Sequence, residues 1–158
     1  MIVRALAVGL LFVTQAVQAP NPISWSLTLS RQAPVRRGET FSVRLIADMQ
    51  PGWHLYSINQ PEGGPIATQI SMPPGQSFTF ARAISESKTH TIFDQSFGMP
   101  VRLHTEKAEF GLPVRVGANA APGAGTLAVE VRYQSCTDTL CLPPRTVKIG
   151  VTVQVRER

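Results

Sequence analysis

The chain has 158 residues, of which 43% are hydrophobic and 16% charged, and its formal net charge is +5. This length suits about one domain, and the composition is too apolar for disorder and too mixed for a multi-span membrane protein. Thirteen Pro and 12 Gly residues leave little room for long helices. With only two Cys residues, a disulfide-dense scaffold and a four-cysteine zinc module are both excluded.

Residues 1–19 have the pattern of a secretory signal peptide. Arg4 forms a short positive region, and an apolar run over 5–13 follows it. This run is well short of the ~20 residues that span a bilayer, so a membrane anchor is disfavoured. Cleavage is expected after Ala19, or after Ala16 because Pro20 hinders the first choice. The mature domain is then 20–158, and export would place it in the periplasm.

The mature chain alternates polar and apolar residues with the period of β-strands. Clusters of Pro and Gly separate the alternating segments, and no segment has a helical period. This pattern predicts one all-β domain, an immunoglobulin-like β-sandwich of about eight or nine short strands. The expected strands are 24–30, 40–47, 53–57, 68–72, 77–82, 101–103, 108–116, 126–134 and 146–155.

The basic residues are scattered along the chain, with no run longer than two. No nucleic-acid motif accompanies them, so nucleic acid is not an expected partner. A metal site is not expected either, because the two cysteines have no nearby pair of histidines. Met49, Met72 and Met99 are far apart in sequence, which argues against a copper or zinc binder. No cofactor is predicted.

The reactive groups that stand out are Cys136 and Cys141, in the segment YQSCTDTLCLPP that follows the strand 126–134. The structural disulfide of an immunoglobulin fold joins two sheets, so its cysteines lie far apart in sequence. A bond across a six-residue ring stabilises a protein by only about 2 kcal/mol. Exchange chemistry needs an attacking thiolate and a second thiol that resolves the mixed disulfide, and this pair supplies both. A small local staple stays open as the alternative.

Asp138 lies between the two cysteines. A carboxylate beside a thiol raises the thiol pKa and slows its attack, which would limit indiscriminate exchange. An ordinary turn residue is the competing interpretation of Asp138.

Three segments together resemble the N-terminal periplasmic domain of the DsbD family of thiol–disulfide interchange proteins. They are YQSCTDTLCLPP, PGWHLY at 51–56 and FDQSFG at 93–98, and the resemblance extends over roughly 23–155. It implies an immunoglobulin-like sandwich whose cysteine pair cycles between dithiol and disulfide. A thioredoxin-like donor, itself reduced through a membrane-embedded conduit, would supply the electrons. A periplasmic disulfide isomerase or the reductant of cytochrome c maturation would receive them.

The resemblance also assigns roles to residues. Cys141 would form the mixed disulfide, Cys136 would resolve it, and Phe97 is the best candidate for a cap that shields the pair. Asp94 matches an acidic cap position. Further residues expected to line or cap the site are Phe93, Gly98, Tyr56, His54 and Tyr133. His54 is expected to be a non-catalytic neighbour, and His90 and His104 are expected at the surface without a role.

The chain departs from the family pattern at three positions of the site. Four residues separate the cysteines, where the family has five, and Gln95 replaces a second acidic residue. Ser96 stands where an aromatic cap residue can occur. The sequence carries neither a membrane conduit nor a thioredoxin-like domain, so both are expected to act in trans on a monomer. The alternative function is a non-catalytic secreted sandwich, a binding or chaperone module with a structural Cys136–Cys141 disulfide.

Overall fold

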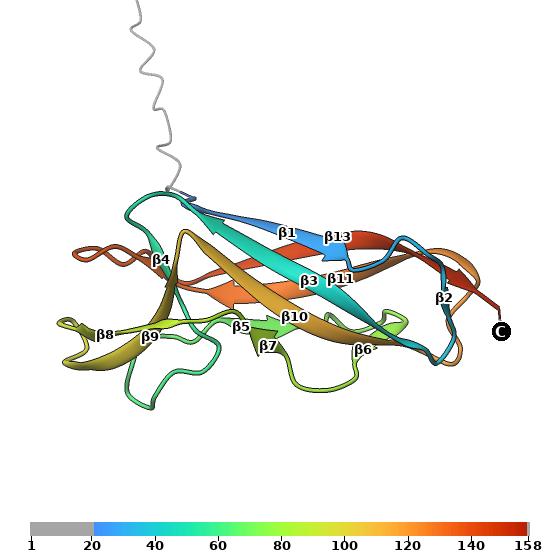
Figure 1. Ribbon diagram of the computed structural model, residues 1–158, viewed down its shortest axis with the longest axis horizontal. Helices are drawn as coiled ribbons and strands as arrows, with labels where there is room; N and C mark the ends of the chain where they lie inside the picture. The colour runs from blue at the N-terminus through green and yellow to red at the C-terminus, as the bar shows by residue number, and fades with distance from the viewer. Residues whose placement is uncertain (1–20, 158) are drawn as a thin grey trace, which may run out of the picture.

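A computed structural model describes residues 21–157, and all regular structure in this part of the chain is β (Figure 1). The strands are β1 (Ile23–Leu29), β2 (Val35–Arg36), β3 (Thr40–Met49), β4 (His54–Tyr56), β5 (Gln69–Ser71), β6 (Phe78–Phe80), β7 (Ser85–Glu86), β8 (His90–Asp94), β9 (Met99–Thr105), β10 (Lys107–Val116), β11 (Gly123–Tyr133), β12 (Ser135–Cys136) and β13 (Arg145–Arg156). The predicted signal peptide at 1–19 lies outside the described residues. Within 21–157, no helix is long and apolar enough to cross a membrane.

Two sheets form the sandwich. The first has the order β1-β3-β10-β6, with β7 also paired to β10, and the second has the order β2-β13-β11-β5. Strand β3 alternates almost perfectly between buried and exposed side chains, as its sequence TFSVRLIADM predicts. The long β11 and β13 pair antiparallel over their whole length, whereas β2 adds to β13 in parallel. The β-sandwich prediction is therefore confirmed.

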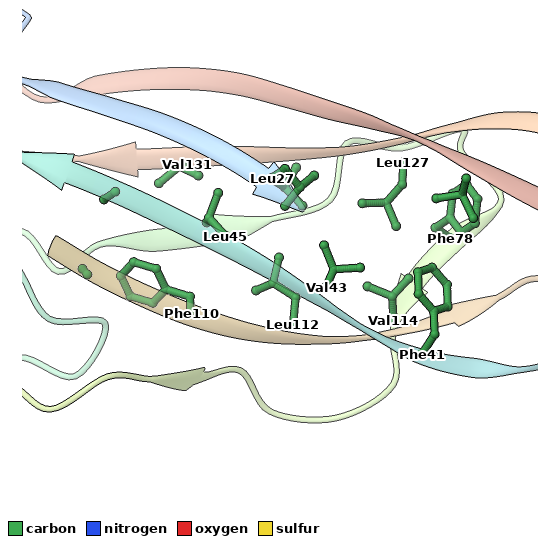
Figure 2. Close-up of a cluster of buried hydrophobic side chains, with 14 of the residues drawn as sticks. Leu27, Phe41, Val43, Leu45, Phe78, Phe110, Leu112, Val114, Leu127 and Val131 are labelled. Carbon is green, nitrogen blue, oxygen red and sulfur yellow. The ribbon is translucent and has the colours of Figure 1, made fainter. Parts of the chain in front are cut away.

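The main core fills the space between these two sheets. Leu27 and Leu45 of the first sheet face Leu127 and Val131 of the second, and all four side chains are buried (Figure 2). Phe41 and Phe78 close one end of this core with an edge-to-face contact at 6.4 Å between ring centroids. Burial of such apolar surface contributes about 25 cal/mol per Å² to folding, which makes this core the main source of stability.

A third, smaller sheet lies at one end of the sandwich, away from β2 (Figure 1). Its order is β12-β4-β9-β8. Strand β9 leads directly into β10 of the first sheet through Glu106, whose φ of 63° marks the sharp corner between the two sheets. The third sheet has its own buried cluster of Tyr56, Val101, Leu103 and Cys136, against which Phe97 and Met99 pack. This separate cluster contains one of the two cysteines, Cys136.

All nine expected segments are strands, and the structure adds β2, β7, β8 and β12. Three of the four added strands have two residues each, too few to show a period. The fourth, β8, is exposed along almost its whole length, so it lacks the alternation that would reveal it.

Candidate active site

Cys136 and Cys141 form a disulfide whose Cα atoms are 4.1 Å apart. The two residues face each other across a tight antiparallel turn. Hydrogen bonds close the turn on both sides of the pair, since Thr137 N donates to Leu140 O at 2.7 Å and Leu142 N donates to Ser135 O at 3.0 Å. The cysteines themselves thus occupy a non-hydrogen-bonded position, where opposed side chains come closest.

The two cysteines differ sharply in exposure. Cys136 is fully buried and belongs to the cluster of the third sheet. Cys141 is exposed and lines a groove of about 470 Å³. A thiolate that approaches from solvent therefore meets Cys141 first.

Both polar and apolar side chains line the groove. Among residues 21–157, the large hydrophobic side chains classed as exposed are Ile92, Phe93 and Leu140, with exposed fractions of 39%, 57% and 54%. All three line this groove. Exposed apolar side chains gathered at one site are typical of surfaces that bind a partner.

The turn between β8 and β9 forms the predicted cap region. Asp94 organises it, because its Oδ1 accepts a hydrogen bond from Ser96 N at 2.9 Å and its backbone oxygen accepts one from Gly98 N at 2.8 Å. Gly98 has a φ of 65°, a left-handed conformation that glycine adopts without the steric cost other residues meet. The turn brings Phe97 edge-on to the Tyr56 ring, with the centroids 6.4 Å apart.

Tyr56 connects the cap to the sheet beneath it. Its hydroxyl donates a hydrogen bond to Asp94 Oδ2 at 3.0 Å. Burial raises the pKa of Tyr56, and the hydrogen bond and negative charge of Asp94 raise it further. Tyr56 thus stays protonated and remains a donor to Asp94 over the physiological range.

His54 lies on the same strand, and in the strand register it is opposite Cys136. Its side chain is buried, and its ring is 5.3 Å from that of Tyr56. Burial lowers the pKa of His54, while the charges of Asp138 and Asp94 act in the opposite direction. Because the net shift is downward, the imidazole is neutral at pH 7.

The structure brings most of the predicted site residues together. The groove is lined by Cys141, His54, Tyr56, Phe93, Asp94, Phe97 and Asp138. Cys136 is bonded to Cys141 by the disulfide, and Gly98 lies in the cap turn. Gln95 and Ser96, the two cap positions at which the chain departs from the family pattern, also line the groove, and the lining residues that the sequence reasoning missed are Ile92, Gln134, Thr137, Thr139 and Leu140.

The prediction that Tyr133 lines the site is wrong. Tyr133 is buried in the main core, where its ring lies 5.2 Å from that of Trp25 and its hydroxyl donates to Asn21 Oδ1. The alternation along β11 directs the side chain between the two large sheets, so closeness in sequence to Cys136 does not place it in the groove.

The expectation that His104 lies at the surface is also wrong, because its exposed fraction is 1%. Its Nε2 is 3.1 Å from Glu86 Oε2, and Glu86 also accepts hydrogen bonds from Ser57 Oγ and Ile58 N. Burial would raise the pKa of Glu86, but these hydrogen bonds outweigh it and the net shift is downward. The cluster ties β7 to β9 and to the segment after β4. Within 21–157, no three His, Cys, Asp or Glu side chains are grouped so as to hold a metal ion.

Comparisons with known proteins identify a family and a similar fold. The family described as thiol:disulfide interchange protein DsbD, N-terminal, matches residues 26–152, whereas no curated protein matches the chain. Among solved structures, the N-terminal periplasmic domain of ScsB from Proteus mirabilis aligns with 13% identity and a TM-score of 0.51. The alignment covers 85% of this chain and 47% of that one, so this chain spans about half the length of the ScsB domain.

Two further structures align with lower scores. The family 123 glycoside hydrolase from Clostridium perfringens has 12% identity and a TM-score of 0.38, and the alignment covers 86% of this chain and 28% of that one. A fragment of the major pilin of Streptococcus agalactiae has 10% identity and a TM-score of 0.42, with 85% and 56% covered.

Fold and site together define the class of protein, a thiol–disulfide interchange domain carried on an immunoglobulin-like β-sandwich. The family match extends over most of the chain. The chain therefore belongs to the family of the N-terminal domain of the thiol:disulfide interchange protein DsbD.

Proposed function

We propose that residues 20–158 form a periplasmic domain that relays reducing equivalents from a thioredoxin-like donor to disulfides of periplasmic proteins. The Cys136/Cys141 pair would carry them. The observation that supports this most directly is the exposed Cys141 in a groove rimmed by the exposed side chains of Ile92, Phe93 and Leu140. A structural staple would have no use for such a rim, whereas an exchange site must dock another protein.

In the reductive half of the cycle, a donor thiolate attacks Cys141 Sγ. A bond forms between the donor sulfur and Cys141, the Cys136–Cys141 bond breaks, and Cys136 leaves as a thiolate. The second donor thiol then attacks the donor sulfur of the mixed disulfide. The donor becomes a disulfide, and the domain holds two thiols and the electron pair.

In the oxidative half, Cys141 as a thiolate attacks a disulfide of the acceptor, and one acceptor sulfur leaves. Cys136 then attacks Cys141 Sγ, which re-forms the Cys136–Cys141 bond and releases the second acceptor sulfur. The electron pair passes to the acceptor as two thiols. The exposure difference between the cysteines supports these roles, because only Cys141 lines the groove.

The cap turn would control access to the pair. Phe97 packs against the cluster that holds Cys136, and Asp94 fixes the turn through its hydrogen bond to Tyr56. Asp138, exposed in the turn between the cysteines, adds negative charge that disfavours a thiolate nearby. Together they would keep the reduced pair from reacting until a partner displaces the cap.

The cellular setting follows from the sequence features. Export by the signal peptide at 1–19 would place the domain in the periplasm. The membrane electron conduit and the thioredoxin-like donor would then act in trans on a monomer. A periplasmic disulfide isomerase or the thioredoxin-like reductant of cytochrome c maturation would be the acceptor.

The reduction potential of the pair tests this proposal. The mature domain is equilibrated in thiol redox buffers, and free thiols are trapped by alkylation. We expect a value between about −270 and −120 mV, the range of exchange-active pairs. In parallel, Cys136→Ser should trap a mixed disulfide with a thioredoxin-like protein through Cys141, whereas Cys141→Ser should trap none. A potential below about −300 mV, without a trapped complex, would indicate a structural disulfide in a binding module.

A further inference from the structure

His54 has a buried ring nitrogen without a partner. The side chain has an exposed fraction of 6%, and its Nε2 is buried with no hydrogen bond to any described residue. Leaving a buried polar atom unpaired is costly because its lost hydration is not replaced, so such an atom in a folded protein calls for an explanation. The residue also lines the groove that contains Cys141.

The strand register places His54 beside the disulfide. Cys141 is opposite Cys136, Cys136 is opposite His54, and these three residues form a row across neighbouring strands. Opposed residues of antiparallel strands point to the same face, with Cβ atoms about 4.5–5.5 Å apart. Tyr56, two positions further along β4, points to this face as well, and it packs against Cys136. The imidazole of His54 is therefore within reach of Cys136.

We propose that His54 accepts the proton of the Cys136 thiol when Cys136 closes the disulfide, and passes a proton taken from solvent to the Cys136 thiolate when the disulfide opens. This inference rests on the proposed exchange function. It explains why Nε2 is unpaired in the oxidised protein. A disulfide sulfur carries no hydrogen, and reduction creates an S–H donor beside the vacant acceptor.

In the closing step, each proton and each electron pair has a defined donor and acceptor. In the mixed disulfide, Cys141 is bonded to the acceptor sulfur, and Cys136 is a buried thiol whose desolvation disfavours ionisation. Nε2 of His54 takes the thiol proton, and the Cys136 thiolate attacks Cys141 Sγ. The Cys136–Cys141 bond forms while the bond to the acceptor sulfur breaks. That sulfur leaves with the electron pair as a thiolate, and the imidazolium or water protonates it.

The surroundings of His54 suit a base that works near neutral pH. Asp94 and Asp138 lie close enough for their charges to raise its pKa, but burial dominates and keeps the imidazole neutral and ready to accept. Glu106 lines, with His54 and Asp138, a second groove of about 460 Å³. Tyr56 is not a competing base, because it remains protonated and donates to Asp94.

A single-turnover experiment separates the two sulfur steps. The reduced mature domain is mixed with one equivalent of dithiobis-nitrobenzoate, a small aromatic disulfide whose released thiolate is coloured. Attack by Cys141 releases a first thiolate, and closure by Cys136 releases a second. Cys136→Ser identifies the first phase because it lacks the second. The test variant is His54→Asn, and His90→Asn is the matched control, since His90 is an exposed histidine of the same sheet.

We expect His54→Asn to slow the second phase on the order of 100-fold at pH 7, the low end for general acid–base catalysis, and to leave the first phase within about twofold. In the wild type, the second phase should slow as the pH falls through the imidazole pKa. In the variant, it should instead keep rising with pH up to the thiol pKa. His54→Tyr, which retains an aromatic ring, replaces His54→Asn if the latter does not fold.

Three results would overturn the assignment. Equal slowing of both phases would show that His54 only supports the structure, and an unchanged second phase with an unchanged pH profile would exclude a proton role. The same slowing in His90→Asn would show that the effect is not specific. Absence of both phases in the wild type would instead refute the exchange function itself, so the two failures are distinguishable.

Discussion

Replacing Phe97 with Ala should open the cap and accelerate attack on the disulfide by a small thiol. The Phe97 ring contacts the Tyr56 ring edge-to-face, with an angle of 87° between their planes, and packs against the cluster that contains Cys136. An aromatic pair of this geometry is worth about 0.5–1.5 kcal/mol. If the contact exists only in the closed cap, its loss destabilises the closed form. The open form then becomes about 2- to 13-fold more populated, at 1.36 kcal/mol per factor of ten.

The assay is the reduction of the oxidised domain by excess glutathione, followed by alkylation of the released thiols. The pseudo-first-order rate should rise by the same factor, because glutathione reacts only with the open form. Phe93→Ala is the control, since Phe93 is on the neighbouring strand and is 57% exposed. Its rate should stay within about twofold of the wild type. An unchanged or slower rate for Phe97→Ala, or an equal acceleration by Phe93→Ala, would refute the cap argument.

Three further predictions concern docking, cap stability and pH. Leu140→Ser should lower kcat/KM for a thioredoxin-like donor about tenfold, because the donor loses an apolar contact. The rate of reduction by glutathione should not change. An equal loss of rate with both reductants would contradict docking at these exposed side chains. Tyr56→Phe removes the hydrogen bond to Asp94 and should lower the free energy of unfolding, measured by urea titration, by about 1 kcal/mol. An unchanged urea midpoint would exclude a stabilising role for this hydrogen bond. Because the pKa of folded His54 lies below its ordinary 6.5, the folded chain binds fewer protons than the unfolded chain, and stability should fall as the pH drops below about 6.5. The pKa of folded Glu86 lies below 4.5, so Glu86 should add a second fall in stability at lower pH. The variant His54→Asn should lose the first fall and keep the second. If the first fall persists in His54→Asn, another group causes it.

Local patterns predicted most of the sandwich. Strands β3, β11 and β13 are long, and their alternation of apolar and polar residues is dictated by one buried face, so nearby sequence suffices to reveal them. The short β12 escaped prediction because two residues cannot show a period, and β8 escaped it because almost all of its residues are exposed. They are strands because β4 and β9 lie beside them and pair with their backbones.

The candidate site was predicted in the same uneven way. The spacing of Cys136 and Cys141 identified a local pair, and the family resemblance pointed to Asp94 and Phe97. Tyr133 was misplaced because a single position of strand register decides which face a side chain occupies. Ile92 could be recognised as a site residue only once the groove was known, because an isolated apolar residue in a sequence is normally assigned to the hydrophobic core.

The sequence by itself determined the all-β architecture, the approximate positions of the long strands and a local cysteine pair, since each depends on residues close together in the chain. Tertiary structure decided which cysteine is exposed, that the Tyr133 side chain lies in the main core and that His104 is buried. These properties depend on burial and on cross-strand neighbours. Strands far apart in sequence supply both, as when β4 places His54 opposite Cys136.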